Sequence, residues 1–399
     1  MKDRYFDHAA TTYLDNRVLQ AMLPFFSDIY GNPSSFHQVG LKAKDAVADA
    51  RKNIASVLNA REEEIVFTSG GTESDNLALI GTIRAHAGRG KHVITSAIEH
   101  HAVLEPLLLL QKRGEIELTI LPVDREGLVS VKDIETALRP DTILISIMMA
   151  NNEIGTIQPI ADIGRVLLQW KKQQSANFPY FHTDACQAAG AAELDVEKLH
   201  VDLMTINGSK IYGPKGMGLL YIRRGTRIEP ILIGGGQERN LRSGTENVPG
   251  IVGLSTALVL AQQEREQENA RLSTLRDRLI QGLLKIPKTR LNGHPTKRLP
   301  NNVNISFLDI EGEAAVLYLD AEGIYASTGS ACASASLDPS HVILATGLSY
   351  EAAHGSLRFT LGKRTTEQDV DALIATMPGI VEKLRHMSPV NLDMKYFVK

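Results

Sequence analysis

The chain has 399 residues, of which 43% are hydrophobic and 22% charged, and its formal net charge is −3. This balance is typical of a globular protein of two or three domains and argues against nucleic acid as the main partner. The first residues lack a signal-peptide pattern, and no apolar run approaches the roughly 18 residues that span a bilayer, so we expect a cytoplasmic protein without a membrane partner. The two cysteines, Cys186 and Cys332, exclude a disulfide framework and a four-cysteine metal site, and we expect no metal.

Short β-type runs alternate with helical runs through the first part of the chain, which predicts an α/β domain with a mainly parallel sheet. We expect strands at 64–68, 92–96, 142–148, 180–184, 203–206 and 218–222, and helices at 41–58, 73–84, 104–111, 131–137 and 160–172. The segment 251–284 is expected to form one long or broken helix. Strands at 303–308 and 356–360 and a helix at 367–385 then indicate a smaller α+β domain. We predict a large domain over 15–257 and a small domain over 1–14 and 258–399.

The segment 67–76, FTSGGTESDN, combines a strand end, two glycines and a helix start. We expect Thr72 to cap this helix and Asp75 to complete a capping box. Because free N–H groups at a helix start favour an anion, the segment is either a phosphate cradle with Thr72 on the phosphate or an ordinary capped helix. The chain contains neither GxxxxGK[ST] nor GxGxxG, which points away from nucleotides and toward a smaller phosphorylated cofactor.

Two ionisable residues follow later strands in a similar way. Asp184, in HTDACQAAG (182–190), stands at a strand end, where open α/β sheets bind ligands. Lys210, in LMTINGSKIYGPKGMG (203–218), stands in a glycine-rich turn after another strand. Pyridoxal phosphate requires a lysine, an acid for its pyridinium nitrogen and a phosphate cradle. Taken singly, the aspartate could be a strand-end cap and the lysine a solvated turn residue, but their joint order favours this cofactor.

The two cysteines have different surroundings. Cys332 lies in YASTGSACASASLDPS (325–340), among small residues with no apolar partner to bury it. Such a thiol is available for nucleophilic chemistry, and the alternative is a surface linker with an incidental cysteine. Cys186 follows Asp184 closely and is better interpreted as a small core residue.

Together these segments resemble the NifS/IscS-type cysteine desulfurases, which are fold-type I pyridoxal-phosphate enzymes of the class V aminotransferase group. The resemblance covers almost the whole chain, and the SGSAC-type loop is similar to that of the first subgroup. It implies a large, mainly parallel α/β domain and a smaller α+β domain that carries the Cys332 loop. Further matching motifs are YFDHAATT at the start, GNPSSFHQVG (31–40), IEHHAVL (98–104), NNEIGTIQPI (151–160), GGGQERNLRSGTENVPG (234–250), STGSACAS (327–334) and SLRFTLG (356–362).

The resemblance also implies roles for individual residues. Lys210 would hold the cofactor as a Schiff base, Asp184 would face the pyridine nitrogen, and His100 would stack on the ring and assist proton transfer. Cys332 would take the substrate sulfur as a persulfide. Other implied contacts are Gly71 and Thr72 to phosphate, Asn152 and Gln187 to the phenolic oxygen and the substrate, Thr245 to the phosphate of a neighbouring subunit, and Arg358 with Asn32 to the substrate carboxylate.

The implied reaction converts L-cysteine to L-alanine in a homodimer. The sulfur on Cys332 would then pass to an acceptor protein, such as an iron–sulfur scaffold, or to thio-cofactor or tRNA thiolation. Alternatives are a selenocysteine lyase, an aminotransferase and a catalytically silent partner subunit, although an aminotransferase has no use for the loop cysteine.

The sequence departs from the family pattern at two places. Asn207-Gly208-Ser209 replaces the usual Ser-x-His before the lysine, so Asn207 and Ser209 can still donate to phosphate, but an imidazole contact is missing. The chain ends in SPVNLDMKYFVK (388–399), and we expect the longer tail that docks scaffold proteins in some relatives to be absent or altered.

Overall fold

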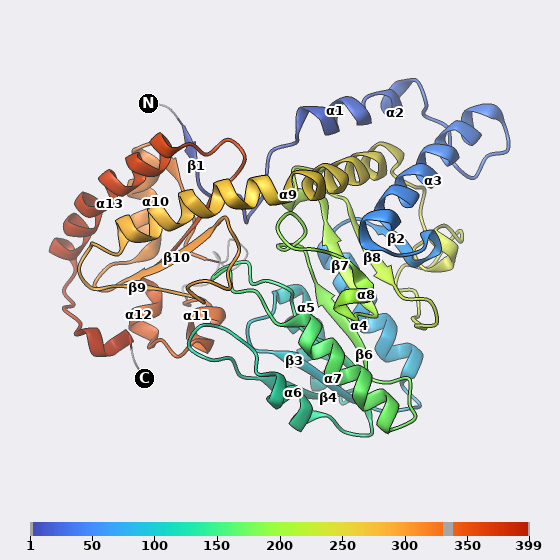
Figure 1. The fold of residues 1–399 in the computed structure, drawn as a ribbon, viewed down its shortest axis with the longest axis horizontal. Coiled ribbons are helices and arrows are strands. Elements are labelled where there is room, and N and C mark those ends of the chain that lie inside the picture. The colour runs from blue at the N-terminus through green and yellow to red at the C-terminus, as the bar shows by residue number, and fades with distance from the viewer. Residues whose placement is uncertain (1–2, 330–337, 398–399) are drawn as a thin grey trace.

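The structure is a computed structural model that describes residues 3–329 and 338–397. Its centre is a seven-stranded sheet (Figure 1) that runs, in order across the sheet, through β2 (Ile65–Thr68), β8 (Gly218–Ile222), β7 (Leu203–Asn207), β6 (Tyr180–Asp184), β5 (Thr142–Ser146), β3 (His92–Ser96) and β4 (Glu117–Leu121). β8 is antiparallel to both of its neighbours, and the other adjacent pairs are parallel. The sheet confirms the predicted α/β fold.

The inner strands are rich in apolar and β-branched residues, and every residue of β3, β5, β6 and β8 is buried. This is the expected pattern of strands covered on both faces. The edge strand β4 is different, since only Leu121 of its five residues is buried. Because an edge strand needs no continuous apolar run, the sequence pattern did not predict β4.

Helices cover both faces of this sheet. On one face α4 (Gly71–His86) and α5 (His101–Lys112) pack into a common hydrophobic cluster. On the other face a second cluster joins α3 (Gln38–Leu58), α6 (Val131–Ala137), α7 (Ile160–Gln173) and the first half of α9 (Val248–Leu283). The short helix α8 (Val196–Leu199) precedes β7.

The long helix α9 is continuous and crosses from the large sheet to a smaller one (Figure 1). Its first half buries Ile251 and Leu254 in the core of the large sheet. Its second half buries Leu275 and Leu279 in a separate cluster, and the polar stretch 262–271 lies between the two. A helix with two apolar faces joined by a polar segment can thus serve two cores. The domain limits at 257 and 258 fall within α9 and stay a prediction.

The smaller cluster surrounds an antiparallel sheet of β12 (Ser356–Thr360), β10 (Asn302–Phe307) and β9 (Thr289–Leu291). The N-terminal strand β1 (Arg4–Tyr5) pairs in parallel with β11 (Ile324–Tyr325) beside it. The remaining helices are α1 (Asn16–Met22), α2 (Pro24–Ser27), α10 (Gly312–Ala321), α11 (His341–Ala345), α12 (Tyr350–His354) and α13 (Glu367–Met387). Within residues 3–329 and 338–397, no helix combines the length and apolarity needed to cross a membrane.

Candidate active site

A cavity of about 230 Å³ lies where β5, β6 and β7 end, at the carboxyl edge of the sheet. Open α/β sheets bind ligands at this edge. Among the residues implied by the motifs, those that line the cavity are Gly71, Thr72, His100, Asn152, Asp184, Gln187, Asn207, Lys210 and Arg358. The fold therefore gathers at one place side chains that are widely separated in the sequence.

The acid and the amine come from neighbouring strands. Asp184 is the last residue of β6, and its Oδ1 accepts a 2.8 Å hydrogen bond from the backbone N–H of Cys186. Lys210 ends the 3₁₀ turn Gly208–Lys210 directly after β7, and its Nζ donates a 2.6 Å hydrogen bond to the carbonyl of Ala10. Both side chains face the same cavity.

The start of α4 corrects the predicted capping. Gly70, not Thr72, is the N-cap, and its φ of 153° and ψ of −177° belong to a region that only glycine adopts readily. Gly70 has no side chain to satisfy the first N–H groups of the helix, so these groups remain available to an anion. Asp75 does not close a capping box, because it is buried within α4 and lines the cavity.

Asn207 borders this helix start. A Cβ atom added to Gly71 would lie 3.5 Å from Nδ2 of Asn207 and 2.9 Å from Sγ of Cys186. Only glycine therefore fits at position 71 without displacing its neighbours. The Oδ1 atom of Asn207 accepts from the backbone N–H and the hydroxyl of Ser209, at 2.9 and 3.0 Å. Ser209 does not line the cavity itself, but it orients the asparagine that does.

These residues fit pyridoxal phosphate. The cavity offers an amine on Lys210, a carboxyl group on Asp184 and a helix start whose N-cap has no side chain, next to the Asn207 amide. Such a cofactor requires these three groups from its protein.

His100 is the N-cap of α5, and its Nδ1 accepts a 3.1 Å hydrogen bond from the backbone N–H of Ala102. Burial lowers the pKa of His100 below its usual value. The ring is therefore neutral at pH 7, and Nε2 holds its proton.

Two further ionisable groups that line the cavity have pKa values above their usual ranges. Burial, followed by the charge of Asp184, raises the pKa of Asp75 well above its usual range. Burial also raises the pKa of the Cys186 thiol well above its usual range. The Cys186 thiol is therefore protonated and a poor nucleophile, which agrees with its interpretation as a core residue.

Arg358 reaches the cavity from β12 of the small sheet, and only 2% of its surface is exposed. Its Nη1 donates to the carbonyl of Asn152 at 3.2 Å, and its Nη2 donates to Oδ1 of Asp7 at 2.8 Å. Its Nε is buried and has no hydrogen-bond partner among the described residues. The guanidinium thus retains a donor that an added carboxylate can satisfy.

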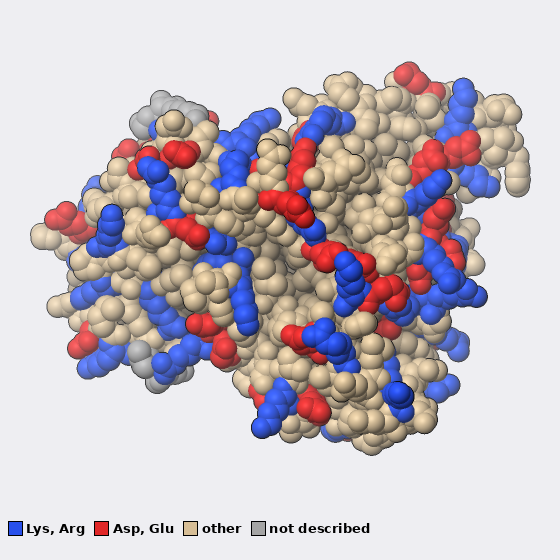
Figure 2. Space-filling view, viewed as in Figure 1, with Lys and Arg blue, Asp and Glu red and all other residues tan. Residues whose placement is uncertain are grey.

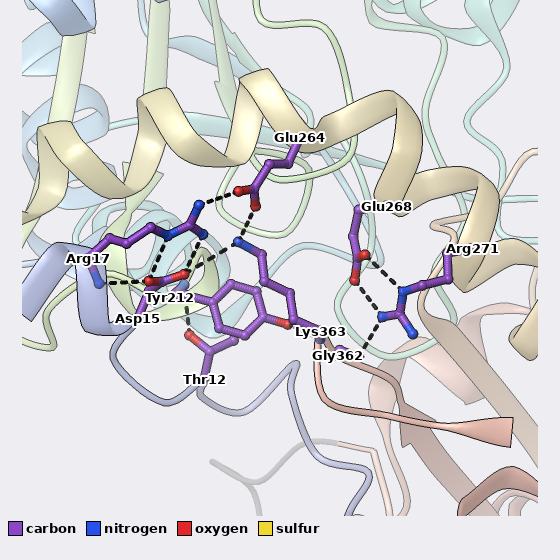
Figure 3. Close-up of polar contacts among 9 residues, drawn as sticks. All are labelled: Thr12, Asp15, Arg17, Tyr212, Glu264, Glu268, Arg271, Gly362 and Lys363. Carbon is purple, nitrogen blue, oxygen red and sulfur yellow. Dashed lines mark hydrogen bonds and ion pairs between the residues drawn. The ribbon is translucent and has the colours of Figure 1, made fainter. Parts of the chain in front are cut away.

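The N-terminal segment clamps the turn that carries Lys210. The backbone N–H and the hydroxyl of Thr12 both donate to the carbonyl of Ser209, at 2.9 and 3.0 Å. The same hydroxyl accepts from the backbone N–H of Tyr212 at 2.9 Å (Figure 3). The turn is therefore fixed on both sides of the lysine.

Tyr212 also links this turn to the small sheet, as Figure 3 shows. Its hydroxyl accepts a 2.9 Å hydrogen bond from the backbone N–H of Lys363, which follows β12. The Nζ of Lys363 bonds Glu264 of α9 at 2.7 Å, and Glu264 pairs with Arg17 of α1 at 2.5 Å. This network couples the turn that carries Lys210 to the strand that holds Arg358.

Besides Ser209, two further residues implied by the motifs do not line this cavity. Asn32 and Thr245 are exposed, and neither lines it. Cys332 lies outside the described residues. Conversely, the cavity includes Ala10 and Met148, to which the motifs assigned no role. Ala10 acts through its backbone carbonyl, for which a side-chain pattern gives no signal.

The comparisons with known proteins agree with this geometry. The aminotransferase class-V family profile matches residues 4–373. The chain is 56% identical to the cysteine desulfurase IscS of Methanosarcina thermophila, over 97% of this chain and 94% of the relative. It is 51% identical to the cysteine desulfurase IscS 1 of Archaeoglobus fulgidus, over 97% and 99%. The chain belongs to the cysteine desulfurases of the class-V aminotransferase family.

A solved structure of a NifS-like protein has a TM-score of 0.87 and 38% identity to this chain, over 97% of this chain and 99% of that one. The fold of this cysteine desulfurase family member and the family predicted from its motifs are therefore both confirmed.

Proposed function

We propose that this chain is a pyridoxal-phosphate-dependent cysteine desulfurase that converts L-cysteine to L-alanine and transfers the sulfur to Cys332 as a persulfide. The observation that carries the proposal is the meeting of Lys210, Asp184 and Arg358 at one cavity in a chain of this family. The lysine and the aspartate suit the cofactor, and the arginine suits the carboxylate of an amino acid.

The Lys210 amine would bind the aldehyde group of the cofactor covalently, and Asp184 would contact the ring nitrogen. Gly71, Thr72 and Asn207 would surround the phosphate. When bound, pyridoxal phosphate withdraws electrons from the substrate's α-carbon and so acidifies its proton. Gln187 and Asn152 would contact the ring's oxygen and the substrate.

The chain's own residues move the protons. The Lys210 amine or the neutral His100 ring accepts the α-proton of the substrate. Arg358 holds the substrate carboxylate, using its buried Nε and the free N–H positions of its guanidinium.

In the sulfur step, the Cys332 thiolate attacks the sulfur atom of the substrate. An S–S bond forms as the substrate's C–S bond breaks, and the bonding pair passes to the substrate's β-carbon, which gains a proton. Return of a proton to the α-carbon then gives alanine. Ser327 precedes Cys332 by five residues in the sequence. It pairs with Arg358 through backbone hydrogen bonds of 3.2 and 2.7 Å, so the chain before the cysteine is attached to the site.

A homodimer completes the proposal, with Thr245 reaching the phosphate bound by the neighbouring subunit. Large apolar side chains are exposed in the segments near Asn32 and Thr245, with Phe36 at 97% and Ile233 at 87% exposure. Exposed apolar groups of this size are typical of protein interfaces.

We further propose that the acceptor is a protein of iron–sulfur cluster or thiolation chemistry and that the enzyme works in the cytoplasm, whose reducing conditions suit a chain with only two cysteines. On the face in Figure 2, acidic and basic side chains are interspersed. This mixture supports a protein acceptor over nucleic acid.

The decisive experiment is mass spectrometry of the purified holoprotein after treatment with L-cysteine. One added sulfur atom on Cys332, with one alanine released per sulfur, is expected. Alanine and free sulfide without the modification would contradict the persulfide role. Faster turnover of selenocysteine that persists in Cys332→Ser would favour a selenocysteine lyase, and absence of the cofactor's visible absorbance would favour a silent subunit.

A further inference from the structure

The N-terminal residues Asp7–Thr12, here called the strap, run between the two sheets and contact active-site residues of both. Toward the large sheet, the carbonyl of Ala10 accepts from Lys210. Toward the small sheet, Asp7 accepts from Arg358 through its carboxylate at 2.8 Å. Asp7 is the acidic residue of the strap, and its contact is with the group that we assign to the substrate carboxylate.

The position of Asp7 is fixed by the fold. Its backbone forms a parallel bridge with Thr360, two residues after Arg358 on β12. Its carbonyl accepts from the backbone N–H of Ala10 at 3.1 Å. The carboxylate is therefore anchored to the same strand as the guanidinium that it meets.

The Arg358–Asp7 pair is largely enclosed, with side-chain exposures of 2% and 19%. Asp7 engages Nη2 and the carbonyl of Asn152 engages Nη1. These two acceptors fix the plane of a side chain that otherwise has many rotamers. The buried Nε of Arg358 has no hydrogen-bond partner in the described part of the chain.

The charge of Asp7 works against substrate binding, because a second carboxylate repels the one that the substrate brings. Its presence beside Arg358 is therefore explained by orientation. We propose that Asp7 is a positioning residue that aims the remaining donors of Arg358 at the α-carboxylate of the amino-acid substrate. The inference rests on the proposed function, which gives Arg358 this ligand.

Three variants separate orientation from charge. Asp7→Asn keeps an acceptor oxygen in place and removes the charge, whereas Asp7→Ala removes both. Asp3→Ala is the matched control, since Asp3 lies on the same segment but bonds the exposed Tyr325 hydroxyl at 2.9 Å, away from the cavity.

The test measures binding to the holoprotein by the change in its visible absorbance. L-Alanine, which has no sulfur to donate, is compared with ethylamine, which has the amine but no carboxylate. Asp7→Ala is expected to raise the Kd of L-alanine about ten-fold, because a hydrogen bond to a charged group is lost. The Kd of ethylamine is expected to stay unchanged, Asp7→Asn to restore most of the L-alanine affinity, and Asp3→Ala to match the wild type.

Three results would each overturn the positioning role: an equal loss of affinity for both amines in Asp7→Ala, no loss of L-alanine affinity in that variant, or no recovery of this affinity in Asp7→Asn. If Asp7→Ala does not fold, Asp7→Glu replaces it, because the longer side chain moves the acceptor by one methylene. Asp7→Glu should then weaken the binding of L-alanine and leave the binding of ethylamine unchanged. A wild-type protein that binds neither cofactor nor L-alanine would instead refute the proposed function itself.

Discussion

The Nζ atom of Lys210 lies 2.6 Å from the carbonyl oxygen of Ala10, to which it donates a hydrogen bond. The N-terminal segment thus holds the amine at the cavity. We expect Lys210→Ala to lose the visible absorbance of the lysine-bound cofactor and all turnover of cysteine, since no other amine lines the cavity among the described residues. Absorbance spectra of the purified proteins check this. Lys215→Ala is the control, because Lys215 donates to the carbonyl of Thr12 and does not line the cavity. This variant should retain the visible absorbance of the cofactor.

The two cysteines should respond differently to substitution. Cys332→Ala is expected to keep the cofactor's absorbance but to reduce alanine formation about 100-fold or more, because the nucleophile is gone. Cys186→Ser should retain most activity, since the buried Cys186 thiol is protonated and takes no part in sulfur transfer. Alanine release during incubation with L-cysteine measures both. A normal rate in Cys332→Ala would contradict the mechanism.

The helix start at Gly71 has no room for a side chain. In Gly71→Ala, the new methyl group would approach Sγ of Cys186 to 2.9 Å. We expect the affinity for pyridoxal phosphate to fall about ten-fold, because overpacking of this kind costs about 1–3 kcal/mol. Fluorescence titration of the cofactor-free protein measures the change. Gly88→Ala, where a Cβ meets nothing within 4 Å, should bind the cofactor like the wild type.

His182 makes the fold sensitive to acid. Burial lowers its pKa to about 4, while the unfolded chain has the usual value of about 6.5. Between these pH values the unfolded state binds the extra proton, so the free energy of unfolding falls as the pH drops from about 6.5 to 4. The slope contributed by one group reaches at most about 1.4 kcal/mol per pH unit.

We expect His182→Asn to show a shallower decrease over this range, as measured by urea unfolding at several pH values. The imidazole of His182 also contacts the hydroxyls of Ser146 and Thr205, at 2.8 and 3.1 Å. The variant is therefore less stable at pH 7, and the prediction concerns the slope. An unchanged slope would show that other groups cause the acid sensitivity.

The hydroxyl of Tyr212 joins the lysine turn to the small sheet through the backbone of Lys363. Tyr212→Phe is expected to lower the free energy of unfolding by about 1 kcal/mol, the typical contribution of one hydrogen bond. Tyr221→Phe is the matched control, because the buried Tyr221 hydroxyl has no partner in the described structure, and its loss should be neutral or stabilising. Urea unfolding of both holoproteins measures the two changes. An equal decrease in the free energy of unfolding in both variants would contradict the role of Tyr212.

Much of the site could be predicted from the sequence because its residues lie at the ends of strands with a strong apolar pattern. Asp184 lies at the end of β6 and Lys210 lies in the turn directly after β7, as the strand pattern predicts. The capping of α4 was predicted wrongly. Glycine at position 70 allowed the helix to begin one residue before Thr72, and the buried Asp75 was then free to face the cavity.

The sequence by itself determined the family and the strand ends and predicted the cofactor chemistry, since residue type and local pattern encode these properties. Only the tertiary structure decided that Asp7 meets Arg358 and that Ala10 meets Lys210. These contacts join positions about 350 and 200 residues apart, and one of them uses a backbone carbonyl that every residue type possesses. Local sequence patterns do not specify such pairings, because they form only when the two sheets pack around α9 and draw the N-terminal segment between them.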